Sequence, residues 1–250
     1  MADFSASYEP TRHARLDALR GLAMVWMTLY HLAFDLNHFG LWRQDFFHDP
    51  FWTLQRSAIV SLFLLCAGMG QALAGQQGQP WQRFWRRWTQ VVACALLVSA
   101  GSYAMFPQSF IYFGVLHGMA VMLLLARLSW GWRSHWLGLA GALAWLLPTL
   151  VQALLPAGPL AEALNGRAHN WLGLVTRLPI TEDYVPVLPW MGVVLCGLAL
   201  GRWLQPQLAG PLPRLLAPLA RLGRYSLSYY LLHQPVLLGL LGLLGWLQAR

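Results

Sequence analysis

The sequence predicts an all-α protein, a bundle of helices that crosses a membrane repeatedly, and three observations carry this prediction. Hydrophobic residues make up 57% of the 250 residues, and charged residues make up only 10%. Soluble domains carry about 25% charged residues, so a water-soluble domain is excluded. The third observation is that the arginines lie at the ends of apolar segments, as they do in membrane proteins.

Apolar segments of about 20 residues, the length of a membrane-crossing helix, recur along the whole chain. We predict about seven membrane spans. They are 17–37, 57–75, 89–106, 110–127, 136–155, 185–204 and 225–247. Residues 80–88 alternate aromatic side chains with arginines and predict a short helix lying on the membrane surface. We therefore expect a single transmembrane domain over residues 1–250.

Arginine is frequent in every second connection between the predicted spans. The N-terminal flank and the segments before residues 89 and 225 contain several arginines, whereas the connection at 107–109 contains no charge. Basic connections remain in the cytoplasm, so we expect a cytoplasmic N-terminus and an external C-terminus. In a bacterial cell this describes a multi-pass protein of the inner membrane. Because topology explains the arginines, nucleic acid is not expected as a partner.

The first predicted span carries a polar stripe. Residues three, four or seven positions apart share a helix face, and this spacing relates Asp17, Arg20, His31, Asp35 and His38. A rise of about 16 Å separates Arg20 from His31, which places His31 in the outer half of the membrane. An ionisable group at that depth indicates function, and we expect Asp35 to orient its imidazole. Arg20 could instead be a topology anchor paired with Asp17, and His38 an ordinary interfacial residue.

Two other predicted spans bring a histidine to a similar depth. "YFGVLHGMAV" contains His117, and "SYYLLHQPVL" contains His233, which Gln234 and the helix-distorting Pro235 follow. Each histidine alone could serve only as a hydrogen bond between helices. Three such histidines also allow a haem-binding electron-transfer protein. A transporter or a scaffold subunit without enzymatic activity is a further alternative.

Four segments resemble transmembrane acyltransferases. "LDALRGLAMVWMTLYH" separates an arginine from a histidine by ten residues and resembles the first helix of enzymes that O-acetylate bacterial surface polysaccharides. "YFGVLHGMAV", "DYVPVLPWMGVVLCGLALGR" and "LGRYSLSYYLLHQP" resemble the heparan-alpha-glucosaminide N-acetyltransferase family, including its short bacterial members. These segments extend over nearly the whole chain and occur in the expected order.

The resemblance implies transfer of an acetyl or longer acyl group from cytosolic acyl-coenzyme A to a hydroxyl or amine of a sugar outside the membrane. His31 matches the histidine of the family motif, which acts as the catalytic base, and Arg20 matches its arginine. Lysosomal members of the family carry their proposed active histidine in the following lumenal segment, where His38 or His48 could correspond to it. The partners implied are the lipid bilayer, acyl-coenzyme A and an external glycan.

This chemistry suggests roles for further residues. Arg20 and three arginines near the start of the third span could hold the phosphates of acetyl-coenzyme A; these are Arg83, Arg86 and Arg87. A donor to the developing oxyanion could come from Gln234, His117 or Tyr30. Direct transfer is expected, although a histidine-acyl intermediate stays open, and no metal site is predicted. The glycines at 197, 201, 239, 242 and 245 predict close helix contacts, within the chain or in a homodimer.

Overall fold

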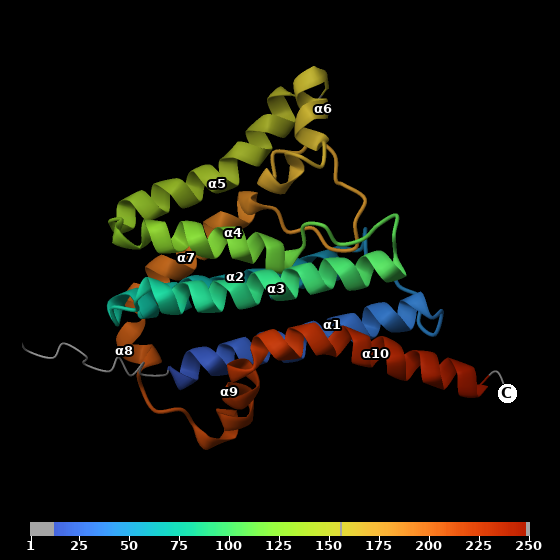
Figure 1. The fold of residues 1–250 in the computed structure, drawn as a ribbon, viewed down its shortest axis with the longest axis horizontal. Helices are drawn as coiled ribbons and strands as arrows, with labels where there is room; N and C mark the ends of the chain where they lie inside the picture. Colours follow the sequence, from blue (N-terminus) through green and yellow to red (C-terminus); the bar gives the residue numbers. More distant parts are fainter. Residues whose placement is uncertain (1–12, 156, 249–250) are drawn as a thin grey trace, which may run out of the picture.

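The computed structural model describes residues 13–155 and 157–248, and helices dominate this part of the chain (Figure 1). No β-strand occurs within those residues; a single isolated bridge joins Phe113 to Tyr184. Short 3-10 turns cover Ser129–Gly131, Asn170–Leu172 and Arg214–Leu216. The helices are α1 (Ala14–His38), α2 (Pro50–Gln76), α3 (Trp81–Met105), α4 (Val115–Leu128), α5 (Ser134–Leu154), α6 (Pro159–Asn165), α7 (Val187–Trp203), α8 (Gln205–Leu208), α9 (Ala217–Arg224) and α10 (Ser226–Gln248).

The prediction of a polytopic all-α bundle is confirmed. Among the described residues, α2, α3, α5 and α10 are long and apolar enough to cross a membrane, and α4 and α7 are shorter apolar helices. The start of α1 and the end of α10 lie at opposite ends of the bundle (Figure 1). The count of seven spans and the cytoplasmic position of the N-terminus stay predictions.

The centre of the bundle is the pair formed by α2 and α7, which make the most extensive helix contact. Small residues allow their backbones to approach closely. A Cβ atom added at Gly68 would lie 2.1 Å from the Val194 carbonyl oxygen, and one at Gly197 would lie 2.4 Å from the Leu65 carbonyl oxygen. The predicted packing role is therefore confirmed for Gly197 and for Gly201, whose added Cβ would meet Met69 at 2.7 Å.

The three glycines of α10 behave differently from those of α7. Nothing in the described part of the chain lies within 4 Å of a Cβ added at Gly239, Gly242 or Gly245. The expectation that these glycines pack closely within the chain is wrong for the described residues. Most apolar side chains around them are exposed, as they would be on a helix surrounded by lipid, although Leu241 is buried.

Two predicted boundaries differ from the structure. Residues 81–88 are not a separate surface helix but the first two turns of α3, because neither glycine nor proline interrupts the chain between Trp81 and Ala100. The helix of the fourth predicted span begins at Val115 rather than at 110. Pro235 lies inside α10, as the predicted span 225–247 implied, and the helix continues past it.

Hydrogen bonds between two connections explain the late start of α4. The Glu182 backbone N–H donates to the Ser109 carbonyl oxygen at 2.8 Å, which holds residues 106–114 against residues 181–185. The Asp183 carboxylate accepts the backbone N–H of Val115 at 2.7 Å and so caps α4. Gly114 leaves room for this carboxylate, since an added Cβ would lie 2.3 Å from Asp183 Oδ2. The connection predicted at residues 107–109 is therefore longer and ordered, and extends from the end of α3 to the start of α4.

A reciprocal glycine contact places α9 across the beginning of α1. A Cβ at Gly21 would lie 1.9 Å from the Leu219 carbonyl oxygen, and a Cβ at Gly223 would lie 1.8 Å from the Asp17 carbonyl oxygen. Only glycine permits this approach at both positions. Since α10 follows α9 after a single residue, the contact brings α10 alongside α1 (Figure 1).

Candidate active site

Two histidines from opposite ends of the chain form a hydrogen-bonded pair between α1 and α10. His31 Nδ1 lies 2.9 Å from His233 Nε2. His233 Nδ1 lies 2.6 Å from the carbonyl oxygen of Tyr230. A carbonyl oxygen can only accept, so His233 Nδ1 carries hydrogen and, in a neutral ring, its Nε2 accepts from His31 Nδ1–H. The remaining nitrogen, His31 Nε2, therefore holds an unshared electron pair.

The unshared electron pair of His31 is available for chemistry. No hydrogen-bond partner of His31 Nε2 occurs in the part of the chain that the structure describes, and this atom is not among the fully buried, unpaired ones. A histidine with one nitrogen fixed by a hydrogen bond and the other free has the arrangement of a general base. Of the residues predicted from the sequence, the structure thus brings His31 and His233 directly together.

Aromatic side chains hold the two rings in place. The Tyr229 ring stacks on His233 with 6.1 Å between centroids and an interplanar angle of 9°. The Tyr229 hydroxyl donates to Thr28 Oγ1 at 2.7 Å, because the Thr28 hydroxyl itself donates to a backbone carbonyl. On the other side, Tyr30 meets His31 edge-on at 5.9 Å and also contacts Phe46. The pair is therefore preorganised by groups from three segments of the chain.

Asp35 has a different partner from the one the sequence suggested. Its Oδ1 accepts from the Gln234 side-chain amide at 2.8 Å, and no contact with His31 is found among the described residues. Asp35 is 1% exposed, and its Oδ2 is buried without a hydrogen bond, as is Gln234 Oε1. Asp35 and His31 share the inward face of α1, but the imidazole turns toward α10. His233 takes the orienting position that was expected of Asp35.

His117 uses both of its ring nitrogens within the fold. The Gly114 backbone N–H donates to His117 Nδ1 at 3.3 Å. The hydroxyl of Ser99 donates to the Ile111 carbonyl oxygen at 2.6 Å, so its oxygen accepts from His117 Nε2–H, 3.1 Å away. His117 therefore connects α3 to the start of α4. This is the hydrogen bond between helices that the sequence allowed for a single histidine.

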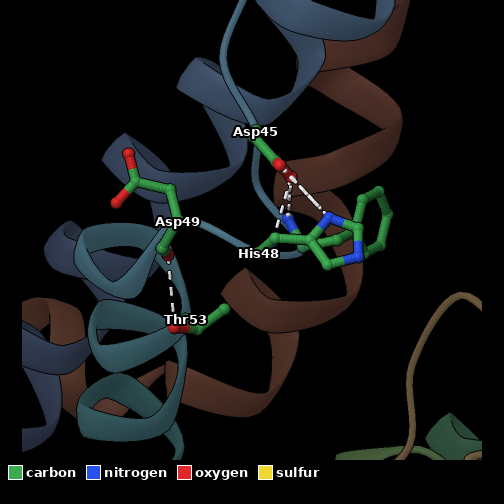
Figure 2. A network of polar contacts seen from close by, with 5 residues as sticks. Asp45, His48, Asp49 and Thr53 are labelled. Carbon is green, nitrogen blue, oxygen red and sulfur yellow. Dashed lines mark hydrogen bonds and ion pairs between the residues drawn. The ribbon is translucent and has the colours of Figure 1, made fainter.

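The other two candidate bases lie at the surface. His38 is the last residue of α1 and is exposed. Figure 2 shows His48 beside Asp45, whose carboxylate accepts from the His48 backbone N–H at 2.9 Å and lies 3.1 Å from His48 Nδ1. These bonds, the backbone one foremost, lower the pKa of Asp45 below its usual value. Asp49 caps α2 by accepting from the Phe51 backbone N–H at 2.9 Å.

The predicted phosphate-binding arginines lie on two helices. Arg20 Nη1 is 2.9 Å from Asp17 Oδ1, which confirms the ion pair expected one turn apart. Arg20 also packs over Gly70 of α2, since a Cβ there would lie 2.5 Å from Arg20 Nη2. The other three occupy the first two turns of α3, whose main neighbour is α4; they are Arg83, Arg86 and Arg87.

The sequence interpretation missed the residues that support His233. Tyr230 acts through its backbone carbonyl, which has no sequence signature. Tyr229 lies four positions before His233, a spacing that puts two side chains on the same helix face, and this signal could have been used. Within residues 13–155 and 157–248, no group of three or more His, Cys, Asp or Glu side chains is arranged to hold a metal ion.

Comparison with known proteins places this site in a family. Neither the curated proteins nor the solved structures gave a match. The sequence model described as heparan-alpha-glucosaminide N-acetyltransferase, catalytic, matches residues 12–235 of the 250-residue chain. This range begins before α1 and ends two residues after His233, so it contains both halves of the histidine pair. The chain therefore belongs to the heparan-alpha-glucosaminide N-acetyltransferase catalytic family, a family of membrane acetyltransferases.

Proposed function

We propose that the protein transfers an acetyl group from cytosolic acyl-coenzyme A to a hydroxyl or amine of a sugar outside the membrane, with His31 as the general base. The observation that carries this proposal is the hydrogen-bond pattern of His31, whose Nδ1 donates to His233 while Nε2 keeps its electron pair. The family of the chain and its membrane-crossing helices support the same class of reaction.

The proposed reaction is a direct transfer. The acceptor O–H or N–H gives its proton to His31 Nε2 as its oxygen or nitrogen bonds to the thioester carbon. The tetrahedral adduct then collapses, the C–S bond breaks, and the departing coenzyme A thiolate takes the proton back from the imidazolium. Such general base catalysis contributes typically about 10²–10⁴-fold.

His233 has a positioning role in this scheme. His233 fixes the tautomer of His31 by accepting a hydrogen bond of 2.9 Å from its Nδ1–H. Once His31 is protonated, the same hydrogen bond stabilises the positive charge on its ring. This is the part that a buried carboxylate plays in a serine protease triad. Here a neutral imidazole, held by the Tyr230 carbonyl, takes that place.

We propose Tyr30 as the donor to the developing oxyanion. Of the three candidates, His117 has both ring nitrogens occupied, and Gln234 uses its amide for Asp35. The ring of Tyr30 lies beside His31, and its hydroxyl donates to no group in the described part of the chain. A hydroxyl preorganised in this way can stabilise negative charge on the carbonyl oxygen.

In the proposed site, the donor arrives from one side of the membrane and the acceptor from the other. The N-terminal end of α1 would face the cytoplasm and its C-terminal end the outside, in the inner membrane of a bacterial cell. Arg20, with the arginines of α3, would add positive charge that draws the anionic donor toward the cytoplasmic side of the protein. The acceptor would enter from the end at which His38 and His48 lie.

The histidine geometry gives the haem alternative no support. His31 and His233 are hydrogen-bonded directly to each other, and His117 is bonded to Ser99 and Gly114. None of these pairs presents two free nitrogens to one iron, as a haem ligated by two histidines would need.

The test is acetyl transfer by purified protein in lipid nanodiscs, with radiolabelled acetyl-coenzyme A and a panel of envelope sugars. We expect label to enter a sugar with the wild type and not with His31→Ala. His38→Ala and His48→Ala are the matched controls, because both histidines are exposed and lie near the same end of α1. Full activity of His31→Ala together with loss in His48→Ala would move the base to the surface turn. A wild type that neither transfers acetyl groups nor binds acetyl-coenzyme A would favour a transporter or scaffold.

A further inference from the structure

An open surface cavity, whose lining residues Tyr225 and Leu232 are exposed, runs along α9 and the first half of α10, outside the histidine pair. Its volume is about 660 Å³. The lining includes two arginines, Arg214 in the 3-10 turn before α9 and Arg221 in the last turn of α9, and then a largely apolar wall. That wall contains Leu222, Tyr225, Ser228, Tyr229 and Leu232.

The character of the cavity changes along its length. At one end, two guanidinium groups offer paired donors to phosphate oxygens. Along α10, aromatic and aliphatic side chains with three hydroxyls, those of Tyr225, Ser228 and Tyr229, offer a surface for a slender and weakly polar chain. The cavity thus suits a ligand with an anionic phosphate head and a long tail of low polarity.

The inner part of the cavity reaches the histidine pair. Tyr229 both lines the cavity and stacks on His233, with 6.1 Å between ring centroids. From Tyr225 to His233 the helix rises by about 12 Å. A chain lying along this wall would therefore pass from the arginines to the neighbourhood of His31 without crossing another helix.

The arginine end of the cavity is held rigidly at the cytoplasmic end predicted for the bundle. Gly21 and Gly223 lock α9 against α1, in the turn that carries Arg20. Because α9 is fixed in this way, its arginine Arg221 keeps a defined position relative to the histidine pair. A preorganised cationic site loses less entropy when it binds an anion.

We propose that this cavity, with Arg214 and Arg221 at its mouth, is the groove for the acyl-coenzyme A donor. The two arginines bind its phosphates, and the pantetheine arm lies along Tyr225 and Leu232 with the thioester directed toward His31. This inference rests on the proposed function and deepens it, since it assigns the donor to a groove that the sequence interpretation did not consider. The alternative source of the same phosphate chemistry is an anionic lipid headgroup.

Coenzyme A binding to the full-length protein tests the proposal. The His31→Ala background is used, so that binding is measured without turnover, in nanodiscs of phosphatidylcholine. We expect Arg214→Gln and Arg221→Gln each to raise the Kd for coenzyme A about tenfold, the loss of one charge-assisted contact. Arg224→Gln is the matched control, because Arg224 lies on the same helix but does not line the cavity. Ser228→Trp, which fills the groove without changing its charge, should weaken binding as well.

The lipid arm distinguishes the two phosphate sources. If Arg214→Gln and Arg221→Gln release co-purified phosphatidylglycerol but leave the Kd for coenzyme A unchanged, the groove holds lipid and the proposal is wrong. If Arg86→Gln weakens coenzyme A binding while Arg214→Gln and Arg221→Gln do not, the donor binds near α3. The proposed groove is then wrong, and the proposed acyltransferase function is still supported. If the wild-type chain binds no coenzyme A, the proposed function fails together with the groove.

Discussion

His31 and His117 are both partly buried imidazoles in one helical bundle, yet their hydrogen bonds differ in kind. His117 accepts at Nδ1 from the Gly114 backbone and donates at Nε2 to Ser99, so neither nitrogen is left for a substrate. His31 donates at Nδ1 to His233 and keeps Nε2 free of any described partner. Depth in the membrane therefore does not distinguish these two histidines, whereas the number of ring nitrogens that the fold leaves unused does.

The two histidines also differ in where their partners come from. The groups around His117 belong to the adjoining helices α3 and α4, which follow each other in the chain. The partner of His31 lies 202 positions away, on the last helix. The hydrogen bonds of His117 can form locally, but the pair of His31 and His233 requires α9 and α10 to be correctly placed on α1.

The largest effect expected is that of His31→Ala on acetyl transfer. Removal of the base should lower the rate by about 10²–10⁴-fold, while the protein inserts into the membrane at normal yield. The rate is measured with radiolabelled acetyl-coenzyme A, and the yield by quantitative immunoblot of membranes. Unchanged activity would remove the distinction between His31 and His117.

His233→Ala should have the next largest effect, because His31 then loses its orienting acceptor. We expect a loss of up to about a hundredfold in kcat, typical of a misplaced reacting group, with little change in KM. His233→Gln can again offer an acceptor to His31 Nδ1 and should recover part of the rate. Equal rates for the two variants would show that His233 only fills space.

His117→Ala should change stability rather than chemistry. It leaves the Gly114 N–H without its acceptor, and an unsatisfied buried group costs about 1–3 kcal/mol. The midpoint of thermal unfolding in detergent should fall, while activity per folded molecule stays that of the wild type. A loss of activity without a loss of stability would give His117 a catalytic role and break the comparison.

The smallest effect concerns Asp183, which caps the same helix that carries His117. Burial raises the pKa of Asp183 above its usual value, so the folded protein favours the protonated acid. The associated stability is present at low pH and is lost as pH rises through the raised pKa. Asp183→Asn keeps an acceptor for the Val115 N–H and cannot ionise.

Thermal unfolding of wild type and Asp183→Asn between about pH 4 and about pH 7 measures this difference. The wild type should lose stability relative to the variant as pH rises. Parallel curves would show that the capping carboxylate titrates as it does in the unfolded chain.

The polar stripe of α1 could be predicted because it depends only on helical period. Its apolar members Met24 and Met27 are 1% and 3% exposed, and Asp35 is 1% exposed, so the predicted face does point inward. The ion pair of Asp17 with Arg20 follows from the same local rule. These features need no knowledge of which helices are neighbours.

Features that depend on neighbouring segments could not be predicted from the period. Asp35 satisfies the spacing for a partner of His31, but Gln234 of α10 competes for its carboxylate. The start of α4 is set by Asp183, which lies 68 positions from the Val115 N–H that it caps. The sequence pattern thus predicted which face of α1 matters, and tertiary contacts decided which side chains meet there.

The central claim, that His31 keeps a free Nε2 while His117 does not, can be measured directly by ¹⁵N NMR of histidine-labelled protein. His31→Gln and His117→Gln variants assign the two signals. The structure predicts hydrogen on Nδ1 and an unprotonated Nε2 for His31, and the opposite tautomer, with hydrogen on Nε2, for His117. A spectrum in which His31 carries its hydrogen on Nε2 would contradict the proposed base.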